Sequence, residues 1–444
     1  MKPSGLILVF ISFGSLQAGH VASGAEPWTL ERALDQALAN NPDSRIARQH
    51  IAAAQAGLEQ ANAAFWPRLQ FQSSYTRTDN AMMVFGSILN QRAYPSAGLN
   101  FNDVPSVDDL NTRGLATVPL YTGGKNKAGR AAAMANAEAA HQENEAVCNA
   151  LGFEVSRAFY AVLKTRQFIR AAEAAVHSFE TNLFIANQRL EGGTLLKTDV
   201  LDLEVRLAQA REDLVRARNA NTLAERALRN LLGLEDGEFV VADSAPAVTA
   251  ADSGDFSDRA ELAAARQRER AAQQQVHAAK AGYLPRASAF GSLDYDYGWK
   301  FQNGGGSYTA GALVQWDIWD GRLTRAKLRE ANANLESARE EQRKLRLALD
   351  LETEQARLEL KTANERLSVT GQSVAQASES ATLTRARFEQ GTAMATQLLD
   401  AETALVAARV RRAEAEADRQ IALAALRKAL ALPQLQSRSK SENK

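Results

Sequence analysis

The sequence predicts an α+β membrane protein in which long helical hairpins alternate with short pairs of amphipathic strands. Three observations lead to this fold class. The chain starts with an apparent secretory signal but has no later apolar run as long as a membrane helix. Its landmarks recur in the same order in two halves of the chain. Several segments of about ten residues also alternate apolar and polar side chains, which is typical of strands that cross a membrane.

Residues 1–25 have the parts of a secretory signal peptide. Lys2 supplies a positive start, an apolar run extends from Leu6 to Leu16, and small residues at 23–25 form a plausible cleavage site. The apolar run is shorter than the roughly 20 residues that a membrane helix needs. We therefore expect an exported protein. The alternative is a buried N-terminal helix.

Composition narrows the class of the mature protein. The chain of 444 residues carries 52 basic and 52 acidic side chains, so its formal net charge is zero. Proteins that bind nucleic acid usually have a basic excess, so no nucleic acid partner is expected. The one cysteine, Cys148, excludes a disulfide within the chain and is not placed to carry a lipid at the mature N-terminus.

Four pairs of landmarks divide the mature chain into two copies of one unit. The pairs are FWPR at 65–68 and YLPR at 283–286, PLYTGGK at 119–125 and DIWDGR at 317–322, RLEGGT at 189–194 and RFEQGT at 387–392, and ALRNLLGL at 227–234 and ALRKALAL at 425–432. We expect residues 26–234 to form the first repeat and 258–432 the second. Each repeat would contain a helix, two barrel strands and a long helical hairpin. An acidic linker at 235–257 joins the repeats, and 433–444 are expected to be a disordered tail.

The longest predicted elements are helices. No proline interrupts residues 125–191 or 322–390, and a helix of either length would extend roughly 100 Å at 1.5 Å per residue. In the first helix apolar side chains recur mostly at steps of three, four or seven, as in coiled coils; they include Val147, Leu151, Val155, Phe159, Val162, Ile169, Val176, Phe179, Leu183 and Leu190. Helices of this length need partners along their whole extent.

Four segments are predicted strands, at about 68–78, 112–121, 286–300 and 307–319. The alternation is clearest after residue 286, where Leu293 and Tyr295 lie on one face and Asp294 and Asp296 on the other. Such alternation with aromatic residues near the ends is typical of membrane barrel strands. For any one strand, the alternative is a half-buried strand of a soluble sheet. The glycines at 304–306 are expected in the turn between the last two strands.

Four strands are too few to close a barrel, and a sheet that crosses a membrane cannot leave an edge open to lipid. If these strands cross a membrane, several chains must therefore pool them. Three chains would supply twelve strands, enough for a lumen. A ring of helical hairpins would bury both flanks of every hairpin in the same way and would enclose a tube.

The two related turns lie at the far end of the long helices from the strands. Gly193 and Gly391 suit the left-handed backbone that ends a helix. Thr194 and Thr392 suit an N-cap of the helix that follows. The hairpin tips would therefore ring the mouth of the tube that is remote from the membrane; the residues expected there are Gly192, Gly193, Thr194, Gly391 and Thr392.

In these landmarks the sequence resembles the TolC-like outer membrane efflux proteins, also called outer membrane factors. The resemblance covers about 27–432 and includes WTLERALDQALANNP near the mature start. It implies a homotrimer with a twelve-stranded barrel in outer membrane lipid and a helical periplasmic tunnel. It also implies docking of the hairpin tips to a periplasmic adaptor and work with an inner membrane transporter of the RND or ABC type. About 20 extra residues of the first repeat, between 76 and 112, would form an extracellular loop.

The resemblance also implies a constriction of the tunnel near the second turn. Family members place two aspartates three residues apart there, and the matching positions in this chain are Gln397 and Asp400. Asp199 and Asp202 have the same spacing after the first turn, and Phe388 matches an aromatic position near the family's gate. Three copies of Asp400 would form a ring that favours cations. The alternative is that the carboxylates complement a helix dipole and the phenylalanine only packs.

No catalytic constellation accompanies these features. The mature histidines are scattered singly, and no spacing typical of a metal or phosphate site occurs. We therefore expect no enzyme activity, no cofactor and no metal. The expected function is an outer membrane channel of a tripartite efflux or type I secretion system; such a component serves drug pumps, protein secretion and metal export. The alternative is an exported periplasmic coiled-coil adaptor or structural protein, and an exported enzyme is a third reading.

Overall fold

The computed structural model describes residues 27–96, 98, 100, 103–235, 239–243 and 255–434. The expected signal peptide at 1–25 lies outside the described residues. So do residues 435–444 of the expected tail and most of the linker.

The two repeats have the same order of elements, apart from additional helices in the first. The first repeat contains α1 (Leu30–Asn40), α2 (Pro42–Ala63), β1 (Arg68–Thr78), α3 (Ala81–Asn90), β2 (Val107–Tyr121), α4 (Lys125–Glu191) and α5 (Lys197–Leu231). The second contains α6 (Ala260–Lys280), β3 (Arg286–Gly298), β4 (Asn303–Gln315), α7 (Leu323–Glu389) and α8 (Ala395–Ala429), with short 3₁₀ turns at Phe256–Asp258 and Ala281–Tyr283. Helices α4 and α7 have 67 residues each, and α5 and α8 have 35 each. The two hairpins therefore match in length.

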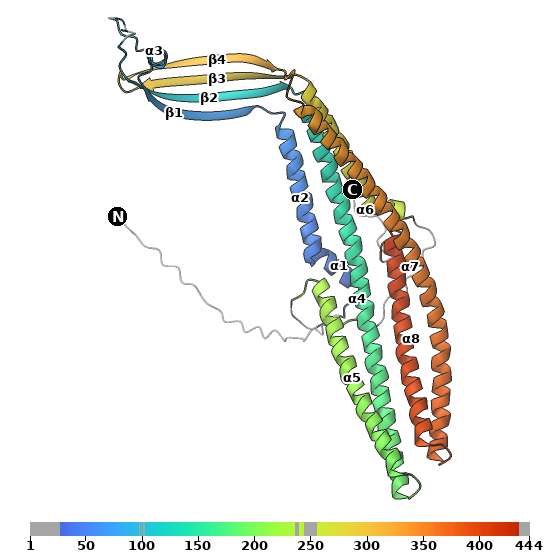
Figure 1. Cartoon of the computed structure of the whole chain (residues 1–444). Helices are drawn as coiled ribbons and strands as arrows, with labels where there is room; N and C mark the ends of the chain where they lie inside the picture. The colour runs from blue at the N-terminus through green and yellow to red at the C-terminus, as the bar shows by residue number, and fades with distance from the viewer. Residues whose placement is uncertain are drawn as a thin grey trace, which may run out of the picture.

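The strands form one antiparallel sheet in the order β1-β2-β3-β4, at one end of the molecule (Figure 1). The repeats are joined within this sheet because β2 pairs with β3, Arg113 opposite Asp294. Strands β1 and β4 are its edges. Each strand has one end at the helices and the other end at the side of the sheet where α3 lies, which is called the far rim below. The hairpin tips and the far rim are therefore the two ends of the molecule.

Along β3 the sheet exposes its apolar face and covers its polar face. Leu293 and Tyr295 are 71% and 52% exposed, whereas their neighbours Asp294 and Asp296 are 8% and 3% exposed. On the polar face Arg113 forms an ion pair with Asp294, and Asn111 donates a hydrogen bond of 2.9 Å to Asp296. A sheet folded in water buries its apolar face instead. The arrangement fits strands whose apolar side meets lipid.

Some strand bounds differ from those expected. Strand β2 begins at Val107 instead of about 112, β3 ends at Gly298, and β4 spans Asn303–Gln315 instead of 307–319. The expectation that glycines 304–306 form the turn is wrong, because they pair with residues 295–297 inside the sheet. A Cβ on Gly304 would lie 2.6 Å from the Tyr295 hydroxyl, and one on Gly305 would lie 2.1 Å from the Asn90 carbonyl. Glycine at these two positions permits close approach of neighbouring groups rather than a turn.

The helices form a wall with two tiers (Figure 1). Next to the sheet the packing order is α2, α4, α6, α7, and towards the tips it is α5, α4, α8, α7. Helix α7 therefore forms one outer flank of the wall, and α2 and α5 form the other. Among the described residues, no helix has both the length and the apolar character needed to cross a membrane.

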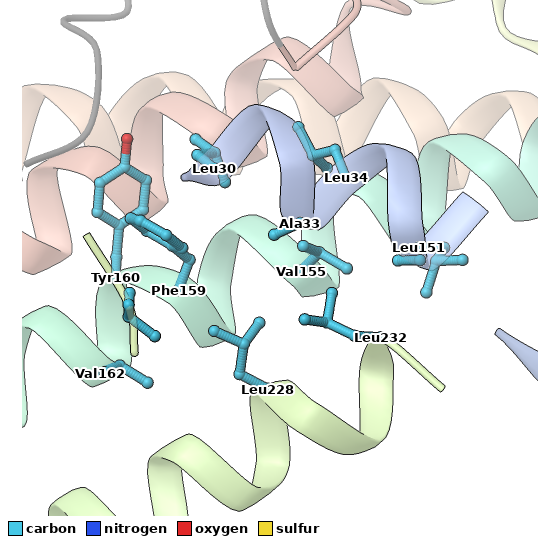
Figure 2. Close-up of a cluster of buried hydrophobic side chains, with 12 residues drawn as sticks. Leu30, Ala33, Leu34, Leu151, Val155, Phe159, Tyr160, Val162, Leu228 and Leu232 are labelled. Atoms are coloured by element: carbon cyan, nitrogen blue, oxygen red, sulfur yellow. The ribbon is translucent and has the colours of Figure 1, made fainter. Parts of the chain in front are cut away.

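An apolar core lies where the two tiers meet (Figure 2). Leu30 and Leu34 of α1 pack with Val155 and Phe159 of α4 and with Leu228 near the end of α5. Thr29 caps α1 with its hydroxyl, and Asn41 caps α2 with its side-chain carbonyl. The N-terminal segment thereby fixes the point at which α5 ends beside α4.

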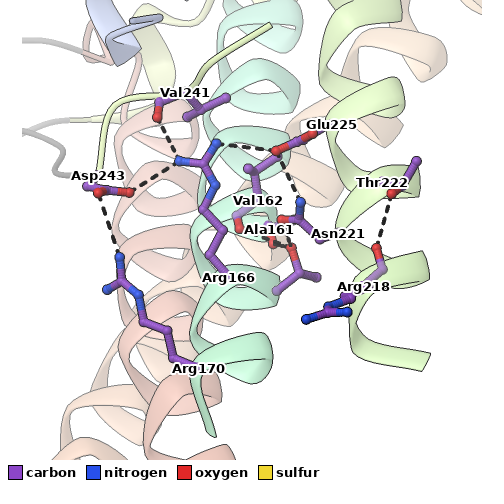
Figure 3. A network of polar contacts seen from close by, with 11 residues as sticks. Ala161, Val162, Arg166, Arg170, Arg218, Asn221, Thr222, Glu225, Val241 and Asp243 are labelled. Carbon is purple, nitrogen blue, oxygen red and sulfur yellow. Dashed lines mark hydrogen bonds and ion pairs between the residues drawn. The ribbon is translucent and has the colours of Figure 1, made fainter. Parts of the chain in front are cut away.

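The linker, expected to be loop-like, returns to this core. Trp28 forms a parallel bridge with Val241, and its ring stacks on Phe239. Arg166 of α4 donates hydrogen bonds to the Val241 carbonyl at 2.6 Å and to the carboxylates of Asp243 and Glu225, each at 3.2 Å (Figure 3). Residues 239–243 of the linker are therefore tied to α4 through Arg166, which also bonds Glu225 of α5.

Candidate functional site at the hairpin tips

The two hairpin tips close with the same hydrogen bonds. The N–H of Thr194 donates to the Arg189 carbonyl at 2.9 Å, and the N–H of Thr392 donates to the Arg387 carbonyl at 2.8 Å. Between them Gly193 and Gly391 have φ of +71° and +77°. A left-handed residue after the helix, with a bond from the next residue back into the last turn, is a Schellman motif. The repeated sequence therefore makes the same turn twice.

The threonines end helices rather than start them, so the expected capping role is wrong. The Thr194 hydroxyl donates to the Arg189 carbonyl at 3.1 Å, and the Thr392 hydroxyl donates to the Arg387 carbonyl at 3.0 Å. The following helices begin later, after the N-cap residues Leu196 and Met394. The threonines lie too early in the chain to reach the free N–H groups of those helices.

Arg189 joins the two tips to each other. Its Nη1 donates to the Phe388 carbonyl at 2.8 Å, and its guanidinium lies 4.9 Å from the centroid of the Phe388 ring. Its Nη2 donates to the Thr194 carbonyl at 3.3 Å. No pattern in the sequence singled out Arg189, although an arginine starts both turns. The counterpart Arg387 is exposed and forms no bond to the other hairpin among the described residues.

Phe388 lies in a core shared by the two hairpins. Its side chain is fully buried, with 0% exposure. The surrounding cluster contains Ala175, Phe179, Ala186, Val200, Leu203, Leu207, Ala210, Ala393, Ala395, Leu398 and Leu399. Within one chain the ring therefore packs between hairpins instead of facing open space.

A buried ion pair next to this core was also missed from the sequence. Glu402 of α8 is 2% exposed. Arg385 of α7 donates to its carboxylate from Nε at 3.0 Å, and from Nη2 to the Ser178 hydroxyl of α4 at 3.1 Å. A charge-assisted pair of this kind fixes geometry as well as charge. No local pattern marks it, because charged residues are common on all these helices.

The expected constriction residues lie at the tip end of the molecule but on two hairpins. Gln397 and Asp400 are both exposed near the start of α8, one helical turn apart. The Gln397 side-chain carbonyl accepts a hydrogen bond of 3.3 Å from the Met394 N–H, so it also serves the helix start. Asp199 is half-buried in the first turn of α5. Three of the expected carboxylate or amide side chains thus lie near the tips, two of them on one helix.

A groove lies behind the tips, where α5 and α8 diverge on either side of α4. Its volume is about 500 Å³. Phe168 and Phe179 contribute apolar surface, and Arg206, Asp213 and Arg216 supply charges. In the described residues, no group of three or more His, Cys, Asp or Glu side chains could hold a metal ion. Its nearest lining residues, Phe179, Arg206 and Thr403, are 11–13 residues from the tips along their helices, so the groove begins roughly 15–20 Å away from them.

The chain combines a sheet whose apolar face is exposed with two helical hairpins of equal length. This combination defines a class of protein, the membrane channel subunit with a helical tunnel. The chain belongs to the outer membrane efflux protein family, whose sequence model matches residues 33–234 and 257–432. The resemblance stated from the sequence is therefore confirmed, and so is the fold class. Members of this family are channels rather than enzymes, and the chain is an outer membrane protein with a periplasmic tunnel.

Individual relatives agree with this assignment. The chain is 27% identical over 297 residues to the outer membrane protein TolC of Vibrio cholerae, a match that covers 64% of this chain and 62% of that protein. The matched part thus spans less than two thirds of the relative. Among solved structures, the outer-membrane channel OprN has a TM-score of 0.79 at 22% identity, covering 90% of this chain and 89% of that one. VceC of Vibrio cholerae has a TM-score of 0.77 at 20% identity, covering 91% and 97%.

Proposed function

We propose that the chain is the outer membrane conduit of a tripartite efflux or type I secretion system. Three copies would form a twelve-stranded barrel above a helical tunnel and would passively conduct cargo across the periplasm and the outer membrane. A periplasmic adaptor and an inner membrane transporter of the RND or ABC type would supply cargo and energy. One observation carries this proposal: a single chain leaves both edge strands of its sheet, β1 and β4, without a neighbouring strand. It also leaves the outer helices on both sides of its helical wall without a neighbouring helix on that side.

The flanks support a homotrimer. Edges β1 and β4 present unpaired backbone groups, which lipid cannot satisfy and a neighbouring chain can. On α7 an exposed apolar stripe formed by Leu347, Leu351 and Leu358 lies on the side of the helix opposite the buried Leu349 and Ala356. This stripe therefore faces away from its own chain. Packing it on the α2 and α5 flank of the next chain would close a ring.

The tips support docking of the adaptor. Gly192, Gly193 and Thr194 of the first tip, like Gly391 and Thr392 of the second, are exposed. They present backbone and small side chains at the end most remote from the membrane.

The tip carboxylates support a cation-favouring constriction. Asp400 is exposed, so three copies would form a ring of negative charge in the proposed trimer. Asp199 and Gln397 would add polar groups around it, and Phe388 would hold the tips in position from the core. In planar bilayers we expect Asp400→Ala to lower the preference for cations over anions. An unchanged selectivity would remove Asp400 from the proposal.

The first experiment is the mass of the detergent-extracted protein, purified from separated outer membranes. A mass of three chains is expected, because both flanks of each chain are then covered. A single chain in detergent would contradict the shared barrel. Co-purification with a periplasmic adaptor, tested with and without substitutions at the tips, then addresses the tripartite role.

A further inference from the structure

Helix α3, within the extra residues of the first repeat, lies on the polar face of the sheet at its far rim. Val84 and Ile88 of α3 are fully buried against Val107, the first residue of β2. Side chains alternate along a strand, so Val107 shares a face with Asp109 and Arg113. That face is the covered, polar one, opposite Leu293 and Tyr295.

The turn after α3 is anchored on the same face. Gln91 is completely buried and donates from Nε2 to the Asp108 carbonyl at 2.8 Å and to the Asp109 carboxylate at 2.9 Å. Arg92 donates to the Gly306 carbonyl at 3.2 Å, and its own carbonyl accepts from Asn303 at 2.9 Å. These bonds connect the turn to β2 and β4.

Two glycines make room for this turn. A Cβ on Gly298 would lie 2.1 Å from Gln91 Oε1, and a Cβ on Gly305 would lie 2.1 Å from the Asn90 carbonyl. Gly298 follows Asp296 by two residues, and Gly305 pairs with Asp296, so both lie on the polar face. The sheet is thus shaped to hold α3 on this side and not on the lipid side.

The opposite side of α3 is apolar, and none of the described residues covers it. Met82 is 78% exposed and Leu89 is 47% exposed. Met82 and Leu89 are seven residues apart and share the helix side that faces away from Val84 and Ile88. Residues 81–90, AMMVFGSILN, contain no charged side chain. Such a surface is unfavourable in water unless another apolar surface covers it.

We propose that the α3 helices of three chains meet near the barrel axis and form an apolar constriction at its outer mouth. This inference rests on the proposed trimer, in which the polar face of the sheet lines the lumen. Lipid cannot cover α3 there, because the helix is on the lumen side. Barrels of about eight strands are filled by side chains and those of 16 or more leave a wide channel. A helix about 10–12 Å across is therefore large enough to narrow a twelve-stranded lumen.

Cross-linking tests the contact between copies. In a Cys148→Ser background the chain has no other cysteine, so Met82→Cys would be the sole thiol. Oxidation of the detergent-purified trimer should give a covalent dimer on non-reducing gels, because two of three axial thiols can pair. Phe71→Cys, on the outer apolar face of β1 with 76% exposure, is the matched control and should stay monomeric. Met83→Cys, 52% exposed, is a second probe if the first variant is not produced.

Conductance tests the constriction. Locking two α3 helices together should lower the conductance of the Met82→Cys channel in planar bilayers by about twofold or more, and a reducing agent should restore it. A native trimer without Met82 cross-links would overturn the contact between α3 helices. Cross-links that leave conductance unchanged would overturn the constriction. A wild-type protein that is not trimeric would instead contradict the proposed function itself, so the two failures are distinguishable.

Discussion

At the scale of single residues, the repeated turns have become unequal. Arg189 and Arg387 occupy equivalent places in RLEGGT and RFEQGT, but only Arg189 bonds the other hairpin, through the Phe388 carbonyl. The two turns have the same backbone hydrogen bonds, but only the first turn contacts the other hairpin. A contact of this kind determines how firmly the tips are held together.

We expect Arg189→Ala to loosen the tips. The change removes a charged donor from a carbonyl near a buried core, a loss of about 1–3 kcal/mol. In planar bilayers the conductance should rise, because the hairpins separate more easily at the mouth. The matched control is Arg387→Ala, which should leave conductance at the wild-type value. Equal effects of both substitutions would show that the bond from Arg189 has no special role.

Gln397→Asp is expected to strengthen the charge of the mouth. It would place a second carboxylate one helical turn before Asp400, so a trimer would gain three negative charges. Cation selectivity, measured as a reversal potential in a salt gradient, should increase, and the increase should shrink at high ionic strength because salt screens exposed charges. Glu379→Gln, an exposed α7 position more than two helical turns from the tip, serves as a control for a distant charge change. A selectivity that does not move with Gln397→Asp would place this helix face outside the conduction path.

At the scale of elements, each hairpin depends on one left-handed glycine. Gly193 has a φ of +71°, where a side chain is strained, whereas Gly192 has a φ of −73° and ordinary space for a Cβ. Gly193→Ala should destabilise the folded protein by about 1–2 kcal/mol in each chain. Gly192→Ala should be neutral or slightly stabilising. Thermal denaturation of the purified protein compares the two, and similar shifts would contradict the turn geometry.

Glu352 of α7 bonds both Arg259, which precedes α6, and Lys428 of α8. The stabilisation that these contacts give the folded protein is predicted to weaken in acid. Burial by itself would raise the pKa of Glu352 on α7, but bonds donated by Lys428 of α8 and Arg259 before α6 outweigh it, so its pKa lies below the ordinary value of 4.5. A lowered pKa in the folded state stabilises the protein above the unfolded pKa, and this contribution is lost as the pH falls through the folded pKa.

Glu352→Gln should therefore lower the melting temperature at neutral pH, and the difference from wild type should shrink as the pH falls below about 4.5. Glu354→Gln is the control. Glu354 is exposed, and its one ion pair among the described residues is a long one of 3.9 Å to Arg357 of the same helix. Its melting temperature should follow wild type at every pH. A constant difference between Glu352→Gln and wild type across the acid range would contradict the role of the carboxylate charge.

At the scale of the whole molecule, stability depends on neighbours that a single chain lacks. Leu351 is 59% exposed on the outer flank of α7. Leu351→Glu should place a charge in the contact between chains and shift detergent-purified protein from trimer to monomer. Ala348→Glu adds the same charge at an exposed position about a sixth of a turn from Leu351 on the same helix, beside the apolar stripe rather than in it, and it should leave the trimer intact. Light scattering after size-exclusion chromatography measures both. A stable trimer of the Leu351 variant would exclude this flank as the interface.

Much of the fold was predictable because its signals are local. Helix periodicity, strand alternation and turn glycines each depend on residues within a few positions of one another, and the doubled order of landmarks made the repeat visible. The two long helices were expected at 125–191 and 322–390, and α4 and α7 have nearly these bounds. The glycines at 304–306 misled the prediction, because glycine serves a turn and a close approach equally well, and only the packed neighbours distinguish them.

By itself the sequence determined the repeated unit, the long helices, the apolar-out strands and the left-handed glycines of the tips. The tertiary structure alone decided that Arg189 reaches Phe388, that Glu402 is buried beside Arg385, and that α3 lies on the polar face of the sheet. The physical reason is the range of the interactions. Periodicity is a property of neighbouring residues, whereas these contacts join residues from separate elements, whose proximity arises only when the whole chain packs.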